Sequence, residues 1–237
     1  MQPGPRPRAA VVLPGTGSNA AFAKVAFGPC VSGLSIPLIA VEPDPRRVIE
    51  SYVTAMVDAS QRYGPILVGG ISLGAAAAVN WAIEADATAV AVLVALPPWT
   101  GASGSAPAAL SAAFTAQKLR DQGLDSVTAE MRASSPPWLA DTLTASWHQQ
   151  WPDLPAALDE AARYGAPTLD DLSGCTVPVG ICSAVDDPVH PLAVGEEWAA
   201  RLPRAGLFRT TLDRIGADPA ELGNGAVTAL AATGFVL

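Results

Sequence analysis

Short apolar runs recur along the chain between segments with helical spacing, and this alternation most limits the folds open to it. Strands separated by helices form βαβ units, which place the strands parallel. Half of the 237 residues are hydrophobic and only 15% are charged, which suits a sheet buried on both faces. The runs are Ala9–Leu13, Ile36–Val41, Pro65–Gly70, Ala89–Leu96, Val177–Cys182 and Gly206–Leu212. They predict an α/β protein with a mostly parallel sheet of about six strands.

The stretch between the fourth and fifth runs has no strand pattern. Helical spacing is interrupted there at Ser134–Pro137, at Trp151–Pro152 and at Ala166–Pro167, and such breaks separate helices. The chain is too short for two full-sized domains. We therefore expect one α/β core, formed by residues 1–96 and 175–237, with a helical cap over residues 97–174 inserted after the fourth strand.

Charge and composition exclude several partners. The formal net charge is -8, with 14 Lys and Arg spread along the chain, whereas nucleic-acid binding needs clustered basic residues. The glycine-containing stretch Pro14–Ser18 lacks the third glycine of a dinucleotide fingerprint, and no helix-opening pattern follows it directly. We expect no nucleic-acid partner and no cofactor.

The cysteines and the N-terminal residues bear on compartment and membrane association. Cys30, Cys175 and Cys182 have no metal-ligand spacing, and their odd number favours reduced thiols. The apolar run Ala9–Leu13 is too short for a signal peptide or a membrane span. We expect a cytoplasmic protein with no bound metal and no membrane partner; the oligomeric state is left open.

One motif carries the chemistry. Gly70-Ile71-Ser72-Leu73-Gly74 matches G-x-S-x-G and lies between an apolar strand and an alanine-rich helix. In that setting the serine occupies a strained turn that lifts its hydroxyl above the sheet, and small neighbours are a steric requirement. The following helix directs its N-terminal amides at the space above Ser72. The alternative interpretation is a glycine-rich structural turn.

With this elbow in place, the chain resembles a compact member of the α/β-hydrolase superfamily that lacks the first two strands, over nearly its whole length outside the cap. The resemblance implies that the backbone amides of Leu73 and Thr16 form the oxyanion hole. Thr16 belongs to Pro14-Gly15-Thr16, where the family often has His-Gly-x.

The same resemblance implies a catalytic acid in the loop after the strand that follows the cap. Val185–Pro191 reads Val-Asp-Asp-Pro-Val-His-Pro, which is similar to the family pattern Asp-x-x-x-Pro and makes Asp187 the acid. Asp186 is the alternative acid, although a solvated turn or a helix N-cap explains it better.

The family's histidine is missing. Where the family has Gly-His-Asp-Pro after the last strand, this chain has Gly216-Ala217-Asp218-Pro219. A serine hydroxyl without a base is a poor nucleophile. Three explanations stay open: an engineered change at Ala217, a natural pseudoenzyme, or a substitute base. The chain has two histidines, His190 in the acid loop and His148 in the cap, and His190 is the candidate substitute.

The cap is rich in tryptophan, with Trp99, Trp138, Trp147 and Trp151 between Pro97 and Gly174. Clustered indoles over a serine site can form the roof of an apolar pocket, or they can simply bury the cap against the core. The candidate substrate-binding residues are Trp99, Trp147, His148 and Trp151. Two hypotheses result: a hydrolase of an ester or thioester with a hydrophobic group, inactivated where Ala217 replaces the base, or a non-catalytic protein that binds a small hydrophobic molecule.

Overall fold

Six parallel strands form one sheet in the order β2-β1-β3-β4-β5-β6. The structure is a computed structural model that describes residues 6–84, 88–235 and 237. The strands are β1 (Ala9–Leu13), β2 (Leu38–Ala40), β3 (Ile66–Ile71), β4 (Ala89–Ala95), β5 (Val179–Ala184) and β6 (Ala205–Thr210). The predicted sheet is confirmed in strand number and direction.

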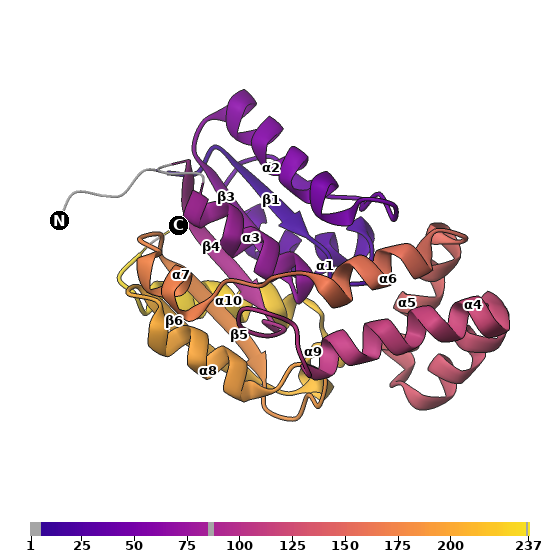
Figure 1. Cartoon of the computed structure of the whole chain (residues 1–237). Coiled ribbons are helices and arrows are strands. Elements are labelled where there is room, and N and C mark those ends of the chain that lie inside the picture. The colour runs from indigo at the N-terminus through magenta and orange to yellow at the C-terminus, as the bar shows by residue number, and fades with distance from the viewer. Residues whose placement is uncertain (1–5, 85–87, 236) are drawn as a thin grey trace.

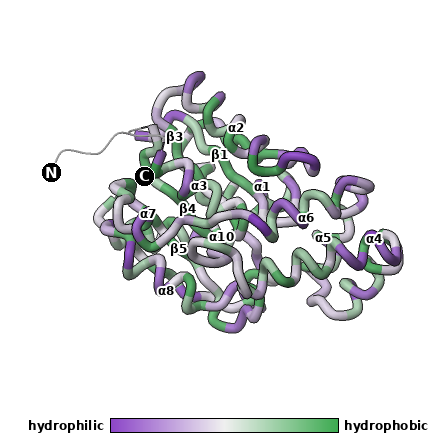
Figure 2. The backbone as a smooth tube through the Cα atoms, in the orientation of Figure 1, coloured by the Kyte–Doolittle hydropathy of each residue, from purple (hydrophilic) through white to green (hydrophobic). Residues whose placement is uncertain are grey.

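Helices cover both faces of the sheet (Figure 1). On one face lie α1 (Ala20–Ser32) and α10 (Ala220–Ala231), which pack on each other and on the strands. On the other face lie α2 (Val48–Tyr63), α3 (Leu73–Glu84) and α8 (Leu192–Arg201). Successive side chains of each strand point to opposite faces of the sheet. Val11 therefore packs in the core beneath α2 and α3, and Val12 packs in the core beneath α1. Figure 2 shows the resulting hydrophobic centre.

Two helices differ from the sequence-based expectation. Helix α1 begins at Ala20, directly after the glycine-containing stretch, where no helix opening was expected. The Asn19 side chain caps it by accepting a hydrogen bond from the backbone N–H of Phe22. After β6, the chain forms the short helix α9 (Leu212–Ala217) instead of continuing as strand to Leu212, because the Thr211 side chain caps a new helical turn.

The segment between β4 and β5 forms α4 (Pro107–Ser134), α5 (Pro137–Gln150), α6 (Leu154–Arg163) and α7 (Leu169–Gly174). Helix α4 is kinked at Gly123, whose φ is +78°. The three expected breaks coincide with the junctions between them. Helices α4, α5 and α6 enclose an apolar cluster that includes Leu119, Trp147 and Leu158, and they lie beyond one end of the sheet (Figure 1). The fourth strand is therefore followed by a helical cap.

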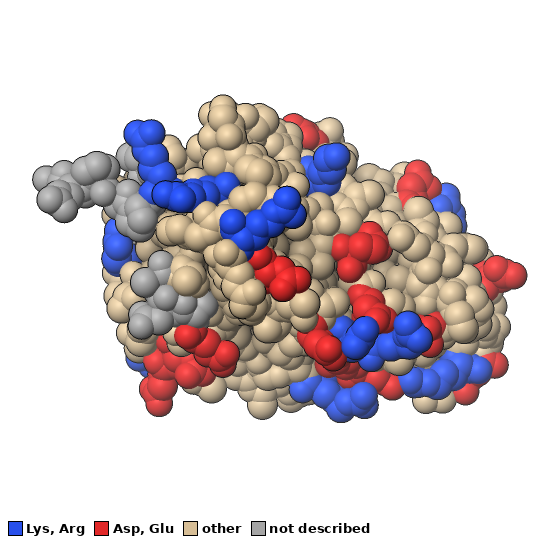
Figure 3. Space-filling model, turned by 90° about the horizontal axis from the view of Figure 1, so that it is seen from above, with Lys and Arg blue, Asp and Glu red and all other residues tan. Residues whose placement is uncertain are grey.

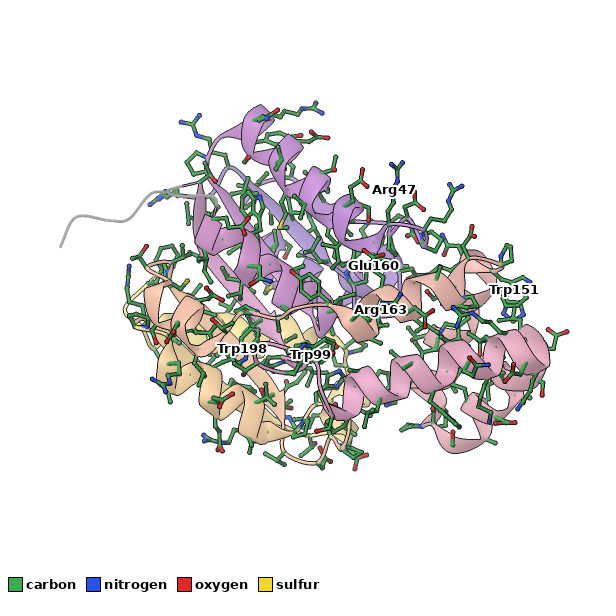
Figure 4. The ribbon with its side chains drawn as sticks, in the orientation of Figure 1. Arg47, Trp99, Trp151, Glu160, Arg163 and Trp198 are labelled. Carbon is green, nitrogen blue, oxygen red and sulfur yellow. The ribbon has the colours of Figure 1, made fainter. Side chains whose placement is uncertain are left out.

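The cap is joined to the core by a carboxylate at a helix N-terminus. Glu160 of α6 accepts hydrogen bonds from the backbone N–H groups of Val48 (2.7 Å) and Ile49 (3.0 Å), the first two residues of α2. These amides have no intrahelical partner, and the positive end of the helix dipole favours an anion there. Figure 4 shows Glu160 pointing at the start of α2, next to Arg47.

Surface charge is mixed. Acidic and basic side chains are interspersed on the face shown in Figure 3, with uncharged surface between them. None of the helices in the described ranges is both long enough and apolar enough to cross a bilayer.

Close packing of α10 on the sheet depends on Gly180, and this can be tested. A methyl group at Gly180 would overlap the carbonyl oxygen of Ala226 in α10. We expect Gly180→Ala to lower the free energy of unfolding by roughly 1–3 kcal/mol, as overpacking does. The matched control is Gly33→Ala, because nothing lies within 4 Å of the added methyl there. Denaturant unfolding of both variants measures the effect, and an equal loss in both would contradict this packing argument.

Candidate active site

Ser72 lies in a tight turn between β3 and α3. Its φ is +50°, a left-handed conformation that costs a non-glycine residue energy, and its backbone N–H donates to the carbonyl oxygen of Ala95 (2.9 Å). A side chain at Gly70 would overlap the backbone of Gly74. One at Gly74 would approach within 2.5 Å of the carbonyl oxygen of Pro14. The two glycines of the motif are therefore required by the packing around the serine.

His190 lies within hydrogen-bonding distance of this serine. The Nε2 atom of His190 is 2.9 Å from Oγ of Ser72, and its Nδ1 atom is 2.8 Å from Oδ2 of Asp187. With the ring proton on Nδ1 donated to the carboxylate, Nε2 is free to accept the hydroxyl proton of Ser72. The three side chains thus form one continuous hydrogen-bonded chain, an arrangement that suits a serine nucleophile, a base and an orienting acid.

The loop between β5 and α8 carries both Asp187 and His190, and the Asp187 carboxylate folds this loop into a turn. Oδ1 of Asp187 accepts the backbone N–H of Val189 (2.8 Å) and of His190 (3.1 Å), while Oδ2 faces the imidazole. Aspartate side chains commonly close turns by bonding to backbone two or three residues ahead. One carboxylate therefore fixes both the backbone and the ring of His190.

The electrostatics keep Asp187 ionised. Burial raises the pKa of its carboxyl group, but the hydrogen bonds and the charge of His190 together with the two backbone N–H groups lower it more, so the net shift is downward. The Asp187 side chain is only 7% exposed, and that of His190 17%. A charged carboxylate at this depth stabilises an imidazolium ion.

One of the two expected oxyanion donors, Leu73, follows Ser72 directly, and the other, Thr16, lines the same cavity as Ser72. Leu73 is the first residue of α3, so its amide has no intrahelical acceptor. Thr16 lies in the loop after β1, and this loop packs directly on the elbow: a methyl at Gly15 would lie 3.3 Å from the carbonyl oxygen of Ile71 and 3.5 Å from Cβ of Ser72. The buried hydroxyl of Tyr52 donates to the carbonyl oxygen of Pro14 (2.9 Å) and holds the loop from the α2 side.

A cavity of about 560 Å³ opens above Ser72 between the core and the cap. Its walls are mostly apolar. Lys118 and Glu130, which form an ion pair with each other, also line it. The large apolar lining residues are Phe22, Ile71, Leu96, Phe114, Val127, Met131, Trp138, Leu139, Leu143, Trp147, Leu158, Val189, Leu212, Ile215 and Leu222.

Of the four candidate substrate-binding residues, the structure brings Trp147 to this cavity. Trp99 instead donates from Nε1 to the carbonyl oxygen of Tyr164 (3.2 Å) and lines a separate surface groove. His148 is exposed and bonds to the carbonyl oxygen of Thr144 (2.8 Å). Trp151 is 40% exposed and lies on the cap, away from Trp99 (Figure 4). The structure thus places these three residues outside the lining of the cavity above Ser72.

The described residues contain no group of three or more His, Cys, Asp or Glu side chains placed to hold a metal ion. The three cysteines are unpaired, and burial raises the pKa of the Cys182 thiol to about 12. A thiol with so high a pKa carries almost no thiolate at neutral pH.

Solved structures share this architecture. No protein-family model matches the sequence, and comparison with curated proteins gives no match. A hydrolase from Oleispira antarctica superposes with a TM-score of 0.68 at 12% identity, over 88% of this chain and 84% of that one. MenH from S. aureus superposes with a TM-score of 0.68 at 12% identity, over 99% of this chain and 97% of that one. A thermophilic esterase from Thermogutta terrifontis superposes with a TM-score of 0.63 at 15% identity, over 88% of this chain and 82% of that one.

The chain has the α/β-hydrolase fold. Within that fold, Ala217 marks the place where the sequence pattern led us to expect a histidine. Here the segment after β6 forms α9, whose first backbone N–H, that of Leu212, donates to Oδ1 of Asp186 (2.8 Å). Ala217 ends this helix as an exposed residue, outside the lining of the cavity. The structure therefore places position 217 away from the cavity that holds Ser72, and it places the Asp186 carboxylate at the start of α9.

Phe22 and Trp138 line the cavity but were not among the candidate residues. Their rings stack at a centroid distance of 6.3 Å and an angle of 18°. Phe22 was missed because α1 was not expected, although Asn19 is a good N-cap residue and could have indicated its start. Trp138 was seen only as one of several cap tryptophans, and a cluster of indoles does not tell which of them face inward.

The lowered pKa of Asp187 predicts how its contribution to stability depends on pH. A carboxylate whose pKa is lowered by folding stabilises the fold fully at pH values above the ordinary Asp pKa of about 4. This stabilisation is lost as the pH falls through the pKa of the folded state. We therefore expect the difference in unfolding free energy between the wild type and Asp187→Asn to shrink between about pH 5 and pH 2. Urea unfolding across this range measures it, with exposed Asp213→Asn as control. If the difference in unfolding free energy between wild type and Asp187→Asn grew towards acid pH, the lowered pKa of Asp187 would be contradicted.

Proposed function

We propose that the protein is a serine hydrolase that cleaves an ester or thioester carrying a hydrophobic group. The observation that carries the proposal is the hydrogen-bonded chain from Ser72 through His190 to Asp187, with distances of 2.9 Å and 2.8 Å. It supplies the base that the sequence lacked at position 217. Structural neighbours with the same fold include a hydrolase and an esterase, which supports this reaction class by analogy of fold.

The reaction proceeds in two acyl-transfer steps. Nε2 of His190 takes the proton of the Ser72 hydroxyl as Oγ attacks the substrate carbonyl, and the backbone N–H groups of Leu73 and Thr16 bind the oxyanion. The intermediate then expels the alcohol or thiol, which receives the proton from His190. A water molecule, deprotonated by His190, attacks the acyl-enzyme, and the proton returns to Ser72 as the acid leaves. Asp187 stabilises the imidazolium in both steps.

The cavity favours a neutral, hydrophobic substrate. Its charged residues other than the triad acid are Lys118 and Glu130, and they neutralise each other. A charged substrate group would lose its hydration without gaining an unpaired counter-ion there. An apolar acyl group gains from burial against Met131, Leu139 and Leu143, at about 0.8 kcal/mol for each methylene.

The non-catalytic alternative, a binding protein on the same fold, rested on Ala217 alone. Because His190 lies within hydrogen-bonding distance of Ser72, the absence of a histidine at position 217 no longer favours it. Reaction of Ser72 with a fluorophosphonate probe separates the two functions, since an inert pocket leaves the serine unlabelled.

His190 is expected to be indispensable and His148 dispensable. We expect His190→Ala to lower kcat for p-nitrophenyl esters by roughly four or more powers of ten, as loss of a triad base does. His148→Ala should leave kcat within about threefold, since that side chain is exposed and bonded to its own helix. Ester hydrolysis and probe labelling measure both. Retained activity in His190→Ala would refute the triad.

Introducing a histidine at position 217 gives an independent check that His190 is the base. We expect Ala217→His to leave kcat unchanged, because this residue is exposed at the end of α9 and lies outside the cavity lining. The double variant His190→Ala, Ala217→His should stay as inactive as His190→Ala. Activity regained in the double variant would show that the segment after β6 reaches the serine.

The cavity also predicts a preference for acyl length. We expect kcat/KM to rise from acetyl to octanoyl esters as methylenes are buried, by up to about fourfold for each methylene. Leu143→Trp, which fills the cavity, should remove this gain while sparing the acetyl ester. The same substitution at Leu110, which is 55% exposed and outside the cavity lining, is the control. An unchanged length profile in Leu143→Trp would place the acyl group elsewhere.

A further inference from the structure

The oxyanion loop, residues 14–19, is held from two opposite elements. From the core, the Tyr52 hydroxyl of α2 donates to the carbonyl oxygen of Pro14 (2.9 Å). From the cap, the Gln150 side chain of α5 donates from Nε2 to the carbonyl oxygen of Ser18 (2.9 Å). Thr16 lies midway between the two anchored carbonyl groups, so the direction of its amide depends on both.

Gln150 is built into the cap as a fixed donor. It is the last residue of α5, is 4% exposed, and also donates from Nε2 to Oγ of the fully buried Ser146, at 2.9 Å. Buried amides are costly to leave without partners. The two bonds therefore hold the side chain in one orientation, with its amide directed at the oxyanion loop.

Trp147, three residues earlier on α5, contacts the same loop. Nε1 of its indole lies 3.0 Å from the position that a methyl group on Gly17 would take. Gly17 has a φ of +68°, which glycine adopts without strain. Helix α5 thus contacts the loop at Gly17, at Ser18 and, through an exposed hydrogen bond from the Asn19 side chain to Gln149, at Asn19, the three residues that follow Thr16.

From these contacts we propose that Gln150 is a positioning residue, through which docking of the cap sets the orientation of the Thr16 amide. The proposal rests on the function proposed above. Gln150 acts through the backbone of the loop and does not touch the substrate. The oxyanion hole is then complete only when α5 is seated on the loop, so the helix that contributes Trp147 to the substrate cavity also completes the catalytic machinery.

The expected signature is a loss in kcat without a matching loss in substrate binding. An oxyanion donor acts mainly in the transition state, and misplacing a catalytic group by about 1 Å can cost on the order of 100-fold. We expect Gln150→Met, which keeps the side-chain size but removes the donor, to lower kcat by roughly 10- to 100-fold. KM should stay within about threefold.

The experiment compares four proteins on p-nitrophenyl octanoate: wild type, Gln150→Met, Gln150→Glu and Gln117→Met. An ionised Glu at position 150 cannot donate to the Ser18 carbonyl oxygen, so it should behave like Met. Gln117 is the matched control, because it is an exposed cap residue outside the cavity lining whose side chain bonds to Asp121 of its own helix α4; it should keep wild-type kcat. Thermal melts monitor folding of each protein.

A second measurement separates positioning from stability. An alkylboronic acid forms a tetrahedral adduct with Ser72 that needs the oxyanion hole, whereas octanol fills the cavity without needing it. We expect both Gln150 variants to weaken inhibition by the boronic acid as much as they lower kcat, and to leave inhibition by octanol unchanged.

Three results would overturn the inference while leaving the proposed function intact: an unchanged kcat, a loss confined to KM, or loss of folding in both Gln150 variants, which would make the residue purely structural. Failure of the proposed function is distinguishable, because the wild type itself would then hydrolyse no ester and form no boronate adduct.

Discussion

The close approach of three backbone segments around Ser72 is the constraint on which the site depends. Gly70 and Gly74 leave room for the turn between β3 and α3, and Gly74 also meets the carbonyl groups at the end of β1. Gly15 brings the next loop against the serine itself. A single added methyl at Gly74 would separate β1 from α3. The left-handed turn at Ser72, the start of α3 and the oxyanion loop can therefore meet because Gly15, Gly70 and Gly74 have no side chains.

The second organising interaction is the double use of the Asp187 carboxylate. One oxygen closes the turn of the loop after β5, and the other orients the imidazole three residues later. Asp187 and His190 therefore come from one short loop. The segment after β6 forms α9, which contributes Leu212 and Ile215 to the cavity wall.

The cap takes part in this arrangement through two contacts with backbone groups of the core, one at the start of α2 and one at the oxyanion loop. Glu160 joins α6 to the start of α2, the helix that carries Tyr52. Gln150 joins α5 to the loop directly. In both places a buried or half-buried side chain of the cap forms hydrogen bonds with backbone groups of the core. Such directional bonds fix the position of the cap on the core more precisely than apolar contacts alone.

The sequence by itself determined the parallel sheet, the helical insertion and the elbow at Ser72, because strand runs, helix breaks and a glycine motif are local patterns. Its resemblance to the α/β-hydrolase pattern also pointed to Asp187 and Thr16. Only the tertiary structure decided that His190 faces the serine, that Ala217 ends an exposed helix, and that Trp147 alone among the four candidates lines the cavity. Ser72 and His190 are 118 positions apart, and their contact depends on adjacent strands β3, β4 and β5 ending at one edge of the sheet. No local pattern encodes which way a loop turns at that edge, because the direction is set by the hydrogen bonds that its side chains find there.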